Sequence, residues 1–262
     1  RASAGYYNQQ GTLLTDRAER VTGSLVVNPS FLEDHLQVTA NLKGSRNNNR
    51  FANTDAIWTA MAFNPTQPIY SGEDVYGGYY ESLDNAGLPA TGANLNPLGL
   101  LHQEKHRSHV NRLIGNLDMD YKFHFLPELK AHVTLGYDYA KGEGYNHIPE
   151  TAANNFLIGG AYDTYEETLK NRLFTGYLNY NKELPDLKSN LEVTVGHDYQ
   201  YWSATRPPIT YYNDREEVRS TAIARDQRHT LMSIYGRLNY GYDRRYLLAA
   251  TVRRDGTSSF SP

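Results

Sequence analysis

The sequence contains no cysteine, so it can form no disulfide bond and offers neither a thiolate nucleophile nor a thiolate ligand for zinc. It also lacks a strong excess of either charge, because 26 basic and 29 acidic side chains leave a net charge of -3. That balance argues against a nucleic-acid-binding surface. The longest apolar run, Tyr246–Val252, is far too short for a helix that crosses a membrane. A transmembrane helix is therefore excluded, whereas membrane-crossing strands are not.

Two kinds of connection alternate along the chain. Short turns are typified by Leu126–Leu129 and Leu184–Leu187, whereas long polar, aromatic-rich loops cover about 47–105, 142–164 and 204–226. A sheet with tight turns at one end and long loops at the other is typical of a membrane-spanning β-barrel with its turns in the periplasm and its loops outside. We therefore expect function to reside in the loops and in the lumen.

A short repeat, Gly-x-Leu, occurs at Gly23, Gly115, Gly176 and Gly236, and the last three copies lie roughly 60 residues apart, which indicates a repeating unit of one hairpin and one loop. Together with the period-two alternation of apolar and polar residues, this repeat predicts about nine strands. The expected strands are 1–8, 18–28, 35–46, 106–124, 129–141, 165–183, 189–203, 227–242 and 245–256. Nine strands form an open sheet, so we expect the chain to be an internal piece of a larger barrel. Within the first long loop, only Thr54–Phe63 is expected to be helical, and the rest is expected to be irregular.

Alternation also assigns the two faces of the predicted strands. Leu117, Met119 and Tyr121 oppose polar neighbours, and the same division recurs in the later strands. The residues expected to face a polar lumen are Asn116, Asp118, Asp120, Arg237, Asn239, Arg253 and Asp255. The spacing of Asp118 and Asp120 also allows a glycosidase-like carboxylate pair, although acidic residues are expected in a polar lumen in any case. Arg253 and Asp255 are expected to form a structural charge pair, with contact to substrate or a plug as the alternative.

Aromatic residues in the loops are the best candidates for binding, because flat rings cover the apolar faces of sugars or pack against peptides. The candidates are Trp58, Tyr70, Tyr76, Tyr79 and Tyr80 in the first long loop, with Trp202, Tyr211 and Tyr212 in the loop after the seventh strand. The alternatives are that these rings pack the loops together or dock a protein partner. His102, His106 and His109 are spaced for a metal site on a helix, but they diverge if a strand begins near Arg107. We expect no metal site and no catalytic residue.

The final stretch of the chain, YLLAATVRRDGTSSFSP (Tyr246–Pro262), resembles the signature strand of the SusC/RagA family of TonB-dependent outer-membrane transporters. Weaker similarities to this family lie at Asn64–Tyr70, Asn96–Leu101 and the opening strand, Arg1–Gln9. The similarities extend over nearly the whole chain, in an order that matches the first part of the family's barrel.

The resemblance implies an all-β, antiparallel, up-and-down transmembrane barrel in the outer membrane of a Gram-negative bacterium. Members of this family are 22-stranded barrels with an N-terminal plug. They are energised through TonB and paired with a SusD-like surface lipoprotein that acts as a lid. They import oligosaccharides or, in some cases, peptides. For this chain, residues 1–262 are expected to form part of the barrel, and neither the plug nor a signal peptide finds a counterpart. The expected partners are the SusD-like lipoprotein, the TonB complex, an oligosaccharide or peptide ligand and outer-membrane lipid, with no nucleic acid, no cofactor and no enzymatic activity.

Two alternatives to a transporter remain at this stage. A surface binding protein or adhesin built on the same barrel would keep the loops but would need neither lid nor plug. A soluble β-propeller also repeats, but its blades place four strands in about 40–50 residues, whereas this chain uses a longer unit for two strands and a loop. No recognisable motif in the sequence indicates which glycan or peptide is carried. None indicates how many copies of the transporter assemble.

Overall fold

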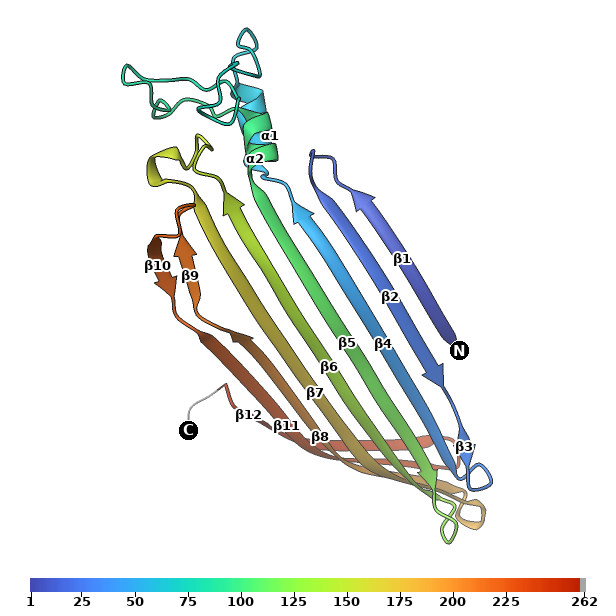
Figure 1. The fold of residues 1–262 in the computed structure, drawn as a ribbon. Coiled ribbons are helices and arrows are strands. Elements are labelled where there is room, and N and C mark those ends of the chain that lie inside the picture. The colour runs from blue at the N-terminus through green and yellow to red at the C-terminus, as the bar shows by residue number, and fades with distance from the viewer. Residues whose placement is uncertain (260–262) are drawn as a thin grey trace.

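A computed structural model describes residues 1–259, so the last three residues of the resembling C-terminal stretch lie outside the described residues. Within this range, nine long strands lie side by side in one antiparallel sheet, in the order β1-β2-β4-β5-β6-β7-β8-β11-β12 (Figure 1). Their bounds are β1 (Ala2–Gln10), β2 (Arg17–Val27), β4 (Leu36–Phe51), β5 (Lys105–Lys122), β6 (Leu129–Ile148), β7 (Ala161–Leu184), β8 (Ser189–Arg206), β11 (Arg225–Tyr242) and β12 (Tyr246–Thr257). The predicted all-β antiparallel sheet and its nine main strands are confirmed.

The two ends of the sheet differ as the sequence predicts. The short turns that follow β2, β5, β7 and β11 gather at one end. The other end carries the long connections together with the short turn between β1 and β2, and there helices α1 (Asp55–Ala62) and α2 (Pro97–Gln103) stand above β4 and β5 (Figure 1). The connection between β7 and β8 shows how a short turn is encoded. Pro185 begins a single 3-10 turn, η2 (Pro185–Leu187), and Lys188 closes it with a left-handed backbone (φ 49°) and a hydrogen bond from its N–H to the Pro185 carbonyl.

Several boundaries within the loops differ from the prediction. The strands continue beyond the expected loop edges, so the loop predicted at 142–164 is confined to 149–160, which contains the 3-10 turn η1 (Phe156–Ile158). Helix α1 was expected, but α2 lies in a stretch predicted to be irregular. The loop predicted at 204–226 contains a hairpin of β9 (Ile209–Tyr212) and β10 (Val218–Ala222), and β3 (Ser30–Phe31) pairs with β4 beside a short turn. These short elements span too few residues to show the long alternation that marks the main strands.

Large apolar side chains remain exposed along one whole face of the sheet. The cross-strand register aligns them from β2 to β12, since directly paired residues share a face. Members of this apolar face are Leu25, Leu42, Leu113, Leu135, Leu178, Val195, Ile234 and Val252. The described residues contain only a small apolar core, in which Ala56, Leu100 and Leu101 join α1 to α2. No helix in residues 1–259 is long and apolar enough to cross a membrane.

The opposite face contains a glycine that is tightly covered by a tyrosine. Gly196 of β8 pairs directly with Tyr235 of β11, whose ring lies over the glycine, so that an added Cβ would stand 2.4 Å from the ring. We expect Gly196→Ala to lower the free energy of unfolding by about 1–3 kcal/mol, because the ring must leave its position. Thermal unfolding measures this loss. Gly236→Ala is the matched control, since the nearest atom to its Cβ would be the Thr194 carbonyl oxygen at 4.0 Å; equal stability of the two variants would contradict the packing described here.

Candidate functional site

The polar face of the sheet carries the residues that were predicted to line a lumen. On β5, Asp118 accepts hydrogen bonds from the Thr134 hydroxyl (2.7 Å) and from the Asn116 amide (2.5 Å). Asp120 pairs with His132 Nδ1 at 2.7 Å, and the His132 ring also contacts Thr134 through Nε2 (2.9 Å). Both carboxylates are therefore used in a cross-strand polar network between β5 and β6, and this network gives each of them a structural role.

A second network occupies the same face on β7, β8 and β11. Glu192 accepts one hydrogen bond from the Asn179 amide (3.0 Å) and another from the Asn239 amide (2.9 Å). Arg237 donates to the Asn239 carbonyl oxygen at 3.3 Å. The residues come from three neighbouring strands, and their amides hold the carboxylate without a direct ion pair. This part of the wall therefore offers amide groups together with the charges of Glu192 and Arg237.

Arg253 and Asp255 form the charge pair that their spacing predicts. Arg253 Nε lies 2.8 Å from Asp255, Nη1 lies 3.2 Å from Asp198, and Nη2 donates to the Ser233 hydroxyl at 2.8 Å. The guanidinium also lies 5.7 Å from the centre of the Tyr235 ring. Four strand residues thus fix one arginine on the polar face, in a cluster where two carboxylates surround a single guanidinium.

The aromatic residues of the first long loop divide into buried and exposed sets. Tyr76 is only 6% exposed, and its hydroxyl donates to the Gly87 carbonyl at 2.6 Å. Tyr79 and Tyr80 are partly buried and pack against Tyr70 and Phe63, respectively. These contacts assign much of the set to packing within the loop.

Trp58 and Tyr70 remain exposed to solvent. Contact of these two rings with a ligand or a partner protein remains a prediction.

The second group of aromatic residues lies in strands, which corrects its placement in a loop. Trp202 belongs to β8 on the polar face, and its ring stacks on His229 with centroids 5.1 Å apart. Tyr211 and Tyr212 belong to β9, whose residues pair with Tyr162 and Asp163 of β7. Trp202 therefore stands at the loop end of the polar wall, separate from the β9–β10 hairpin.

The three histidines that were considered for a metal site do not come together. His102 lies at the end of α2 beside Tyr79. His106 and His109 both belong to β5 and point to opposite faces because they are three residues apart. His106 contacts Glu104 and Asn146, whereas His109 contacts Asn48.

Sequence reasoning missed Asn96, the residue on which the first long loop is built. Asn96 is 1% exposed; its amide nitrogen donates to the carbonyls of Ile69 (2.8 Å) and Tyr80 (3.1 Å). Its side-chain oxygen caps α2 by accepting from the N–H groups of Leu98 and Gly99. An asparagine directly before a proline at the first helical position was the available signal.

Two buried glutamates complete the support of this loop and were also missed. Glu81 accepts from the Asn96 backbone N–H, with both carboxylate oxygens at 3.2 Å. Glu104 accepts from the side-chain amides of Asn53 (2.8 Å) and Asn154 (2.7 Å), and it thereby joins both ends of the first long loop to the loop after β6. Isolated glutamates in a polar loop give no sequence signal for burial.

Burial raises the pKa of Glu81 to about 7, although the hydrogen bond from the Asn96 N–H opposes the shift. The folded loop therefore binds a proton more tightly than the unfolded loop does. Its stabilising effect is complete below the ordinary glutamate pKa and is lost as pH rises through about 7. We expect protease cleavage within 52–104 to be several-fold faster at pH 8 than at pH 5.5. Glu81→Gln, which keeps an acceptor and removes the charge, should abolish this difference; an unchanged pH dependence in the variant would contradict the assignment.

Comparison with known proteins places this geometry in context. The chain is 34% identical to the TonB-dependent receptor SusC of Bacteroides thetaiotaomicron over its whole length, and 24% identical to the TonB-dependent receptor P3 of Formosa agariphila over 99% of its length. Its fold is similar to that of the RagAB peptide transporter, with a TM-score of 0.72 and 20% identity over the whole chain. No family model matches the sequence. The chain spans less than a third of these proteins, namely 28%, 27% and 30% of their lengths.

Proposed function

Because the chain belongs to the SusC/RagA family of TonB-dependent outer-membrane transporters, we propose that the full-length protein imports oligosaccharides across the outer membrane. The energy comes from the TonB complex, and a SusD-like surface lipoprotein covers the barrel. The apolar face of the sheet contacts lipid, and the polar face lines the lumen.

The character of the polar face supports an oligosaccharide as the ligand. Amides and hydroxyls dominate the networks around Asp118 and Glu192, and such groups match the hydroxyl groups of a sugar. Trp202 adds an aromatic ring at the loop end of the wall, where it can cover the apolar face of a sugar ring. Hydrogen-bonding groups below a partly exposed indole are the observation that carries the proposal.

Peptide import is the second candidate, and the Arg253 cluster favours it. Arg253, Asp198 and Asp255 place both signs of charge on the lumen wall, and these charges suit the termini and charged side chains of a peptide. Uptake of labelled oligosaccharides and labelled peptide mixtures by cells that express the full-length protein separates the two candidates. Accumulation of peptides alone would replace the first candidate with the second.

Helix α1 offers a contact surface for the lipoprotein lid. Trp58 and Met61 are 71% and 74% exposed, and Ile57 is exposed beside them. Aromatic and methionine side chains are enriched at the centres of protein interfaces. This helix lies at the loop end of the sheet, opposite the turns that follow β2, β5, β7 and β11 (Figure 1).

We expect Trp58→Ala to weaken co-purification of the lipoprotein with the full-length transporter by about tenfold in affinity, as for the loss of an aromatic anchor. Phe125→Ala is the matched control, because Phe125 is an aromatic residue that is even more exposed (81%) and lies in a short turn at the other end of the sheet. Equal binding of the lipoprotein by both variants would show that α1 is not part of the interface.

A further inference from the structure

Three arginines lie directly opposite one another on the apolar side of the sheet, at its loop end. The register pairs Arg17 of β2 with Arg50 of β4, and Arg50 with Arg107 of β5. Directly paired residues on neighbouring strands project from the same face and repel one another when their charges are alike. A row of three guanidinium groups therefore requires negative charge nearby.

The described residues supply only part of that charge. Arg17 forms an ion pair with Glu19 (2.5 Å), whereas the side chains of Arg50 and Arg107 form no ion pair within residues 1–259. The Nε atom of Arg50 is buried without a hydrogen-bond partner in that range. A buried N–H without an acceptor is costly. Arg50 is therefore suited to donate a hydrogen bond to an acceptor that is not part of residues 1–259.

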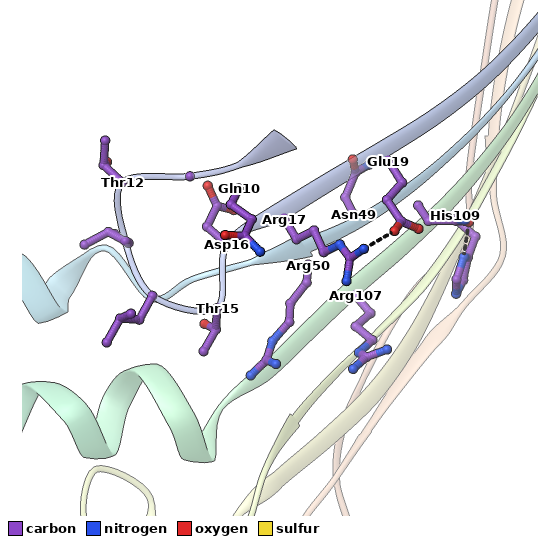
Figure 2. A pocket seen from close by; sticks show the side chains of 14 residues that line it. Gln10, Thr12, Thr15, Asp16, Arg17, Glu19, Asn49, Arg50, Arg107 and His109 are labelled. Atoms are coloured by element: carbon purple, nitrogen blue, oxygen red, sulfur yellow. Dashed lines mark hydrogen bonds and ion pairs between the residues drawn. The ribbon is translucent and has the colours of Figure 1, made fainter. Parts of the chain in front are cut away.

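A cavity of about 490 Å³ opens beside these residues. Its wall includes the turn between β1 and β2, and Figure 2 shows Arg50 and Arg107 extending in the same direction from neighbouring strands. Among the residues that the structure describes, Asp16 and Glu19 are the only carboxylates that line it, against three arginines. The cavity is thus shaped for an anion that enters from outside the chain.

The position of the row relative to the apolar face narrows the choice of anion. On β5, Leu113 is the last apolar residue of this face toward the loop end. Arg107 lies on the same face six residues nearer the loops, which is about 20 Å along the strand. In a barrel strand tilted by about 40°, this corresponds to about 15 Å of height above the apolar band. A phospholipid places its phosphate at the edge of that band, whereas a glycolipid carries phosphate on a saccharide head group that extends higher.

We propose that Arg17, Arg50 and Arg107 bind phosphate groups on the saccharide head group of an outer-leaflet glycolipid. The guanidinium fork matches phosphate oxygens with two parallel hydrogen bonds, and binding supplies the charge that the arginine row lacks. The site lies on the lipid side of the wall, opposite the networks of the lumen. It anchors the turn between β1 and β2 to the membrane surface, and this role is separate from ligand import.

The test uses the full-length protein in detergent, stripped of lipid and titrated with purified lipopolysaccharide while native mass spectrometry counts the bound copies. The triple variant R17Q/R50Q/R107Q should bind lipopolysaccharide at least about tenfold more weakly than the unaltered protein. Dephosphorylated lipopolysaccharide should bind the unaltered protein as weakly as intact lipopolysaccharide binds the triple variant. The control R215Q/R228Q/R245Q removes three arginines that already pair with Glu150, Asp226 and Asp243, and it should bind like the unaltered protein.

Three outcomes would overturn the proposal. Equal binding of lipopolysaccharide by the triple variant and the control would show that the three arginines do not form a binding site. Equal competition by phosphatidylglycerol vesicles or by inorganic phosphate would show that the row recognises charge alone and not a glycolipid head group. If the triple variant does not fold, the single variant R50Q provides the test in its place. Undiminished binding of lipopolysaccharide by a folded R50Q protein would also contradict the proposal. Folding is judged by heat-modifiable migration in gels, and none of these results depends on which ligand is imported.

Discussion

Replacing Leu117 with arginine should destabilise the membrane-inserted barrel by about 2–4 kcal/mol, the usual effect of an arginine on the lipid face near the bilayer centre. Leu117 lies in the middle of the apolar series of β5 and pairs with Ala40 and Leu135 on the same face. The guanidinium would have to enter hydrocarbon there, because Leu117 projects from the apolar face that we assign to the lipid. Barrel assembly in the outer membrane should therefore fall sharply.

The neighbouring substitution Asn116→Arg provides the matched control. Asn116 is adjacent in sequence and points to the opposite, polar face, where its amide contacts Asp118. An arginine there reaches water and a carboxylate, so the barrel should assemble normally. Heat-modifiable migration of the full-length variants in an outer-membrane fraction measures both effects. If Asn116→Arg were the damaging change, the assignment of lipid and lumen faces would be reversed.

The second large effect is expected at Asn96, because one side chain holds together three parts of the first long loop. Asn96→Ala leaves the carbonyls of Ile69 and Tyr80 without their donor and removes the cap of α2. Buried groups left unpaired cost about 1–3 kcal/mol each. We expect the loop to lose its fixed structure and ligand capture by the full-length transporter to fall at least tenfold, while the barrel still assembles.

Asn94→Ala is the control for this effect. Asn94 belongs to the same loop, is exposed, and makes a single hydrogen bond to the Ala62 carbonyl. It should leave protease resistance of the loop and capture of the ligand unchanged. Normal capture by Asn96→Ala, together with a protease-resistant loop, would show that the loop does not depend on this residue.

The long strands were predictable from the sequence because each is specified by a local pattern. Alternation over many residues, as in Leu191–Tyr199, determines which residues lie on the apolar face of the sheet and which lie on the polar face. The short turn at Pro185 is equally local. The pairing of Arg253 with Asp255 also follows from alternation, since residues two apart in a strand share a face.

The loops were less predictable because distant contacts determine them. Glu104 joins Asn53 to Asn154, about 100 residues further along the chain, and no spacing rule connects these positions. Similarly, the β9–β10 hairpin takes its place from pairing with β7, which lies far earlier in the sequence. The arginine row could not be predicted for a related reason. Its members come from three strands, and only the register shows that they are neighbours.

The most direct test of the account is energy-dependent uptake of labelled oligosaccharides by cells that express the full-length protein, with and without a functional TonB complex. A TonB-energised importer should accumulate oligosaccharide in the periplasm only when TonB is present, while surface binding persists in its absence. Binding at the surface without any TonB-dependent accumulation, for either oligosaccharides or peptides, would contradict import and would identify the barrel as a surface binding protein.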